Sequence, residues 1–97
     1  MKKGLAHQEL KMYQNAISDF EEVLKRNSKS ASAYFHMGKS YDGLCKWDKA
    51  IDSYSKGMEI SPKEWAFYLN RANNLRKINK HEEALKDYNH GLEIDSK

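Results

Sequence analysis

The chain has 97 residues, of which 39% are hydrophobic and 32% are charged, and its formal net charge is +3. This length is that of one small domain, and the balance of residue types excludes a disordered chain. The positive charge is too small and too scattered to indicate a nucleic-acid-binding protein, although it slightly favours an acidic partner.

The sequence shows no membrane or targeting signal. Its apolar runs are only a few residues long, and its first residues are too polar for a signal peptide. Cys45 is the single cysteine, so no disulfide can form within the chain. We therefore expect a cytoplasmic protein that has no membrane partner.

Residues 1–30 contain two predicted helical segments. Residues 1–10 have the pattern of the later part of a first helix, and a break is expected near Lys11. Residues 13–26 space their apolar side chains as an amphipathic helix does. These apolar residues are Tyr13, Ala16, Ile17, Phe20, Val23 and Leu24. The polar residues 27–30 predict a break near Asn27 and offer capping side chains to the next helix.

Residues 31–60 predict a helical hairpin. The first helix runs from about Ala31 to Asp42, and Gly43 is expected to end it in the left-handed conformation. Gly38 is small so that the second helix, which carries Ala50, can approach closely. A break is expected near Cys45, before a partner helix over residues 47–60. Its inward side chains are Trp47, Ala50, Ile51, Tyr54 and Met58.

Residues 61–94 predict another hairpin. A break is expected at Ser61, where Ser61, Pro62 and Glu64 match a capping box that begins a new helix. This helix should end near Asn79, because asparagine tolerates the left-handed conformation. Residues 81–94 form the last predicted helix. Its apolar residues are Ala84, Leu85, Tyr88, Leu92 and Ile94.

One pattern recurs through the chain with a period of 34 residues. In the central copy it consists of Tyr34, Met37, Gly38, Tyr41, Ala50, Tyr54 and Pro62. Shifting by one period takes Ala50 to Ala16 and Ala84, and it takes Gly38 to Gly4 and Ala72. This spacing resembles the tetratricopeptide repeat.

The resemblance implies an all-α fold, a right-handed α-solenoid of antiparallel helix hairpins. It implies a single domain over residues 1–97, with a partial first repeat at 1–30 and further repeats at 31–64 and 65–97.

No catalytic or metal-binding constellation is found in the sequence. The four histidines lack the spacing of zinc ligands, and Cys45 has no cysteine partner. His7 and His81 occupy columns of packing residues, which predicts that they are partly buried. Neighbouring glutamates on a helix point about 100° apart and cannot converge on one bond. We therefore expect a non-catalytic protein that uses no cofactor and no metal.

The resemblance also implies a binding surface, because the first helix of each hairpin lines a concave groove in this family. The groove columns are occupied by Phe35, His36, Lys39, Leu69, Asn70, Asn73, Arg76 and Lys77. Asp42, Gly43, Lys2, Leu5 and Glu9 fall on further columns of the same face. One interpretation is a shallow groove for a peptide with acidic character. The other is a solvated helix face without a ligand.

Two further functions stay open at this point. Asn70 resembles the central asparagine of the clamp with which cochaperones bind chaperone C-termini, but the flanking clamp columns hold Phe35 and Lys39. The second is a structural segment that associates with itself. Leu5, Leu92 and Ile94 would present apolar surface on the end helices that a flanking helix normally covers.

Overall fold

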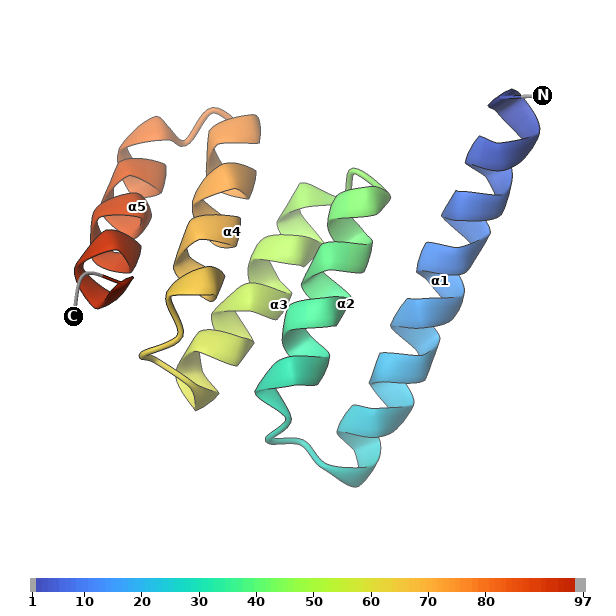
Figure 1. The fold of residues 1–97 in the computed structure, drawn as a ribbon, viewed down its shortest axis with the longest axis horizontal. Coiled ribbons are helices and arrows are strands. Elements are labelled where there is room, and N and C mark those ends of the chain that lie inside the picture. The colour runs from blue at the N-terminus through green and yellow to red at the C-terminus, as the bar shows by residue number, and fades with distance from the viewer. Residues whose placement is uncertain (1, 96–97) are drawn as a thin grey trace.

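The structure is a computed structural model that describes the backbone of residues 2–95 and the side chains of residues 12–94. This part of the chain forms helices joined by short turns, in a row (Figure 1). The helices are α1 (Lys2–Arg26), α2 (Ala31–Gly43), α3 (Trp47–Ile60), α4 (Trp65–Lys77) and α5 (His81–Asp95). Each packs mainly against its sequence neighbours, which confirms the predicted all-α solenoid. No helix in the described part is long and apolar enough to cross a membrane.

The break predicted near Lys11 is wrong, because α1 is one continuous helix of 25 residues. Lysine is a good helix former, and a left-handed turn at this position would cost about 1–2 kcal/mol. Folding residues 2–10 back onto the rest of α1 would also bury little surface, since this segment is shorter than the 13-residue helices α2 and α4. The first repeat is therefore a single rod, and only α2–α3 and α4–α5 form hairpins.

The turns inside both hairpins follow one pattern. Cys45 and Asn79 adopt positive φ angles of 59° and 67°. After each, a backbone N–H reaches five residues back, from Lys46 to the Tyr41 carbonyl and from Lys80 to the Leu75 carbonyl. This is the Schellman arrangement. The prediction for Asn79 is confirmed, whereas Gly43 ends α2 without taking a positive φ.

Of the two helix starts predicted from capping residues, one is confirmed and the other is wrong. The Ser30 side chain accepts a hydrogen bond from the Ala33 N–H at 3.2 Å and caps α2 as expected. The predicted capping box at Ser61 is wrong, because α4 begins at Trp65 with Glu64 at its N-cap and no capping side chain. Ser61 instead ends α3, and its carbonyl accepts from the Glu64 N–H across the intervening turn. The turn that stacks the second hairpin on the first therefore starts α4 later in the chain than the local capping signal predicts.

Two clusters of buried side chains form the core. One joins α3 to α4 and contains Ala50, Tyr54, Met58 and Phe67. The other joins α4 to α5 and contains Ala72, Leu75 and Ala84. Gly38 does face α3, but the side chain that needs the space is the ring of Tyr54 rather than Ala50.

Three predicted packing residues point to solvent instead. Val23 is 43% exposed and Leu85 is 60% exposed, so neither is part of the core. His81 is exposed as well, contrary to the prediction, while the side chain of His7 lies outside the described part. Val23 and Leu85 lie on the first and last helices, where no further helix of this structure covers them.

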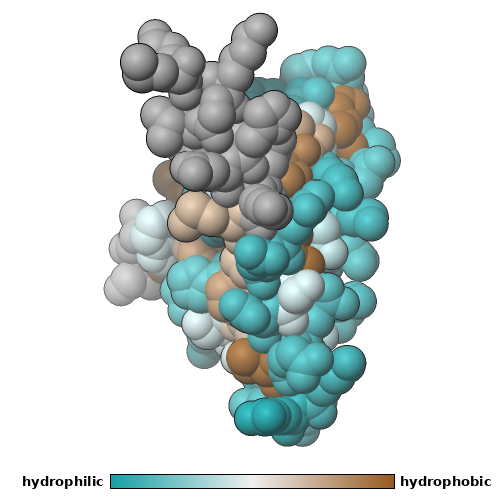
Figure 2. Space-filling view, turned by 90° about the vertical axis from the view of Figure 1, so that its right-hand side faces the viewer, coloured by the Kyte–Doolittle hydropathy of each residue, from teal (hydrophilic) through white to brown (hydrophobic). Residues whose placement is uncertain are grey.

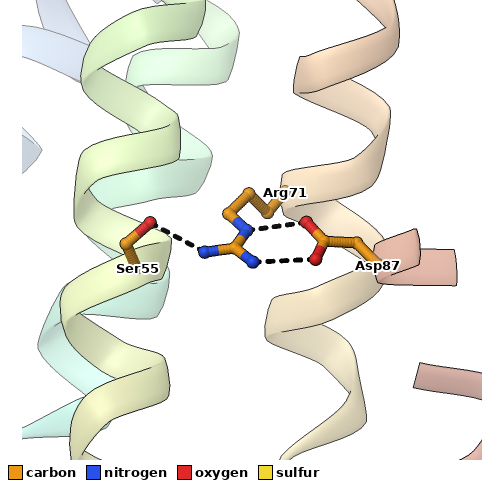
Figure 3. Close-up of polar contacts among 3 residues, drawn as sticks. All are labelled: Ser55, Arg71 and Asp87. Atoms are coloured by element: carbon orange, nitrogen blue, oxygen red, sulfur yellow. Dashed lines mark hydrogen bonds and ion pairs between the residues drawn. The ribbon is translucent and has the colours of Figure 1, made fainter. Parts of the chain in front are cut away.

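An ion pair within the second hairpin is joined to the first hairpin by a hydrogen bond. Arg71 of α4 donates two hydrogen bonds of 2.7 Å to Asp87 of α5 and one of 3.1 Å to Ser55 of α3 (Figure 3). The hydrogen bonds to Asp87 raise the pKa of the Arg71 guanidinium, against the opposing effect of its partial burial. Asp87 is only 6% exposed, so this bidentate pair is largely removed from water.

Candidate functional site

The predicted groove residues lie on α2 and α4, the first helices of the two hairpins. The two helices meet directly at this face, because Lys39 Nζ lies 3.5 Å from Asn70 Oδ1. These residues are 31 positions apart in the chain. The structure therefore brings the two sets of columns together, as the repeat pattern requires. The side chains of Lys2, Leu5 and Glu9 lie outside the described part.

Three cations on this face have no carboxylate partner. Lys39, Arg76 and Lys77 are exposed. Within the described side chains, no Asp or Glu oxygen lies within 4.0 Å of any of them. Lys77 instead lies over the ring of Trp47, 4.7 Å from its centroid. This cluster, the α2–α4 cation cluster, has its charges available for an external anion.

A half-buried carboxylate lies close to the cation cluster. Asp42 accepts a 2.7 Å hydrogen bond from the Tyr54 hydroxyl. Burial raises the pKa of the Asp42 carboxyl, while the Tyr54 hydroxyl and the nearby Lys39 and Lys77 lower it. Burial and the Asp42 charge likewise raise the pKa of Tyr54, so its hydroxyl stays protonated and keeps donating. The Asp42 carboxylate thus joins α2 to α3 and forms no ion pair with the neighbouring cations.

Asn74 of α4 adjoins this carboxylate and is 1% exposed. Its amide lowers the pKa of Asp42, although no hydrogen bond of normal geometry joins Asn74 Nδ2 to Asp42 Oδ1. The group of Asp42, Tyr54 and Asn74 links α2, α3 and α4. Sequence reasoning missed it, because only the stacked helices bring these residues together.

Four of the predicted groove residues are committed to packing or to internal hydrogen bonds. Phe35 is half-buried, with its ring centroid 5.5 Å from that of Phe67 in the core. Leu69 is half-buried against α5 at Gly91. Asn70 donates its amide to the Ala66 carbonyl at 2.7 Å. The Asn73 Oδ1 atom accepts from the Tyr88 hydroxyl, which leaves the exposed amide N–H groups of Asn73 free to donate.

His36 is exposed at the edge of the same face. Its ring stacks on Phe20 of α1, with centroids 5.6 Å apart and planes inclined by 18°. This contact connects α1 to the face formed by α2 and α4. The exposed polar groups that a ligand can reach are therefore His36, Lys39, Asn73, Arg76 and Lys77.

Several hollows lie elsewhere on the surface, and two of them lie between helices of neighbouring repeats. One of about 480 Å³ is bounded by α1, α2 and α3, and one of about 440 Å³ by α3, α4 and α5. Neither is lined by a predicted groove residue. Each mixes positive and negative side chains in similar number, so neither favours a ligand of one charge. The α2–α4 cation cluster, in contrast, consists of positive side chains alone.

Comparisons with known proteins agree with this architecture. A family model for the tetratricopeptide repeat matches residues 1–30, 31–64 and 66–97. No curated protein sequence matches the chain.

Solved structures of MamA have a similar fold. One crystal structure of MamA is 28% identical, with a TM-score of 0.86 over 88% of this chain and 50% of that one. MamA from Desulfovibrio magneticus RS-1 is 23% identical, with a TM-score of 0.83 over 98% of this chain and 54% of that one. The chain thus spans about half the length of the MamA structures that it matches.

Proposed function

Because the chain belongs to the tetratricopeptide repeat family, we propose that it is a non-catalytic protein-interaction module that binds a peptide segment of a partner. The proposed site is the face formed by α2 and α4. The observation that carries the proposal is the α2–α4 cation cluster, whose three positive charges lack carboxylate partners in the described part. A peptide with acidic side chains supplies the missing partners.

The arrangement of donors favours carboxylate groups in particular. Asn73 lies within one helical turn of both Arg76 and Lys77, so the three side chains can converge on one carboxylate. Lys39 faces them from the neighbouring hairpin. The face is short and open, so we expect dissociation constants in the micromolar range or weaker. Binding should weaken with salt, since exposed charges are screened over about 10 Å at 0.1 M.

The test compares two double charge reversals of equal charge. Lys39→Glu with Arg76→Glu alters the proposed site, whereas Lys63→Glu with Lys86→Glu alters exposed lysines away from it. The probes are a fluorescent peptide rich in Asp and Glu and its Asn and Gln counterpart. We expect the first variant to lose about tenfold or more in affinity for the acidic peptide, which is about 1.4 kcal/mol. Equal losses in both variants, or equal binding of both peptides, would show that this face is not the site.

Two alternatives have less support. The cochaperone clamp needs a free central asparagine, but Asn70 already contacts Lys39 and Ala66. Self-association is favoured by a separate observation, the exposure of Leu85 and Leu92 on α5 at 60% and 57%. The exposed thiol of Cys45 supports the proposal that the protein works in a reducing compartment such as the cytoplasm.

A further inference from the structure

The hollow of about 480 Å³ between α1, α2 and α3, here called the α1–α3 hollow, has a counterpart in the next repeat. A shift of 34 residues leads from it to the hollow of about 440 Å³ between α3, α4 and α5. Met37 and Ser53, which line the first, correspond to Arg71 and Asp87, which line the second. The two hollows are therefore the same place in successive repeats, and the contents of one indicate what fits the other.

In the second hollow the chain itself supplies a cation. The guanidinium of Arg71 lies between α3 and α5, where it donates to both carboxylate oxygens of Asp87 and to the Ser55 hydroxyl (Figure 3). A guanidinium is planar and has donors on more than one side, so it can join acceptors from two helices. This place in the repeat is thus built to hold a guanidinium between its second helices.

The α1–α3 hollow keeps acceptors at this place but has no guanidinium. The column of Arg71 is occupied by Met37, whose side chain has no atoms that correspond to the guanidinium carbon and its outer nitrogens. The columns of the two acceptors are occupied by Ser53 and Glu21, so a hydroxyl and a carboxylate are present again with their places exchanged. Met37, Ser53 and Glu21 all line the hollow.

Glu21 is a carboxylate of this hollow without an ion pair. Lys56 lies 3.6 Å from Asp52, and Lys25 lies 3.5 Å from Glu22. Among the described side chains, no lysine, arginine or histidine nitrogen lies within 4.0 Å of the Glu21 carboxylate. The lysines on the rim therefore leave the acceptor in the Ser55 column available to a cation from outside.

Tyr41, on the wall of the same hollow, reports the local charge. Burial raises the pKa of its hydroxyl, and the carboxylates of Glu21 and Asp52 raise it further, against the lowering effect of Lys56. The negative groups thus outweigh the positive one at this hydroxyl, which favours a cation beside it. The Nζ atom of Lys49 lies 5.9 Å from the centroid of the Tyr41 ring, so a cation is already accepted near this wall.

We propose that the α1–α3 hollow binds the side chain of an arginine from a partner peptide. The guanidinium takes the place that Arg71 takes in the second hollow and donates to the Glu21 carboxylate and the Ser53 hydroxyl. The surface at the α1 end is largely hydrophilic, with hydrophobic patches between polar side chains (Figure 2). A charged residue of a partner can therefore approach this end without losing all contact with polar groups.

Two short peptides test the proposal. Each has one central residue flanked by glycines, which is arginine in the first peptide and its uncharged analogue citrulline in the second. We expect the arginine peptide to bind with a dissociation constant of about 1 mM or weaker, because a single side chain buries little surface. Amide signals of the residues that line the hollow should shift in NMR titrations of the labelled protein. Equal binding of both peptides, or shifts confined to other parts of the chain, would overturn the proposal.

A matched pair of substitutions on α1 tests the carboxylate. Glu21→Gln removes the charge from the hollow, whereas Asp19→Asn removes an exposed charge of the same helix that does not line it. We expect Glu21→Gln to weaken binding of the arginine peptide about threefold or more, as for an exposed ion pair, and Asp19→Asn to leave it unchanged. Equal affinities of these two variants would contradict the role of Glu21.

The second repeat also supplies a variant that should bind more tightly and one that should not bind. Ser53→Asp recreates the Asp87 column and should tighten binding of the arginine peptide about tenfold, since a carboxylate replaces a hydroxyl as acceptor. Adding Met37→Arg to Ser53→Asp recreates both members of the pair, so the hollow should be filled from within and binding should be lost.

Circular dichroism separates these effects from unfolding. The double variant should keep the helix content of the wild type, because its new carboxylate is paired as Asp87 is. Undiminished binding of the arginine peptide by the folded double variant would place the site elsewhere. No residue that lines the α1–α3 hollow belongs to the α2–α4 cation cluster, so the two proposed sites can each fail without the other.

Discussion

Gly38 and Gly57 each lie against an aromatic ring of a neighbouring helix. A Cβ atom added to Gly38 would lie 2.5 Å from a ring carbon of Tyr54, and one added to Gly57 would meet the ring of Phe67. Both rings are almost fully buried, at 0% and 2% exposure, so they cannot move aside easily. These glycines therefore set how closely the helices approach.

Gly38→Ala should destabilise the fold, and Gly91→Ala provides the comparison. Alanine gains up to about 1 kcal/mol over glycine inside a helix, whereas overpacking a buried ring costs about 1–3 kcal/mol. At Gly91 the nearest atoms are 3.1 to 3.4 Å from an added Cβ and belong mainly to the flexible Leu69 side chain. We expect a lower urea midpoint for Gly38→Ala and an equal or higher one for Gly91→Ala. A Gly38→Ala midpoint equal to that of the wild type would contradict this assignment.

At the scale of the helices, the contact between the two helices of a hairpin differs from one repeat to the next. Arg71 and Asp87 form the bidentate pair between α4 and α5. One period earlier the same columns hold Met37 and Ser53, which are also buried. The repeat architecture thus accepts either an ion pair or an uncharged pair at this place.

This comparison predicts a non-additive pair of substitutions. Arg71→Met alone should cost about 3 kcal/mol, because it leaves the Asp87 charge buried without its partner. Asp87→Ser alone leaves the Arg71 guanidinium without its carboxylate. The double variant recreates the residues of the second repeat and should be more stable than Arg71→Met. Urea unfolding of the four proteins measures this coupling, and purely additive costs would contradict it.

At the scale of the whole molecule, the two ends of the row differ from its middle. Leu85 and Leu92 of α5 are 60% and 57% exposed, while Ile51 and Met58 in the same columns of α3 are partly or fully buried under α4. Self-association should therefore proceed through this surface of α5.

Leu85→Lys with Leu92→Lys should reduce self-association through α5. The folding stability should change by no more than about 0.5 kcal/mol, because both side chains are largely exposed. Light scattering over a concentration series measures assembly size, and urea unfolding measures stability. Leu75→Lys, at a site that is 7% exposed, is the contrasting core substitution and should unfold the protein. Unchanged large assemblies in the double variant would exclude α5 as the contact.

The sequence alone determined the helices, the repeat period and several turns. Helix identity follows from the spacing of apolar residues, which is a local property. The Ser30 cap and the left-handed Asn79 also depend on neighbouring residues only. The groove columns on α2 and α4 were placed together by the period of the repeat, and Lys39 does reach Asn70. Which of these residues bind a ligand stays a prediction.

The tertiary structure decided what depends on contacts between distant residues. Phe35 packs against Phe67, and Leu69 packs against α5. The repeat columns of the sequence do not predict these contacts. Asp42 is held by Tyr54 across a hairpin, which leaves the neighbouring cations unpaired. The Lys11 break is absent because a left-handed turn there would cost more free energy than residues 2–10 could gain by packing. Local patterns specify each helix, but the free energy of burying one helix against another decides where the chain turns and which side chains remain exposed.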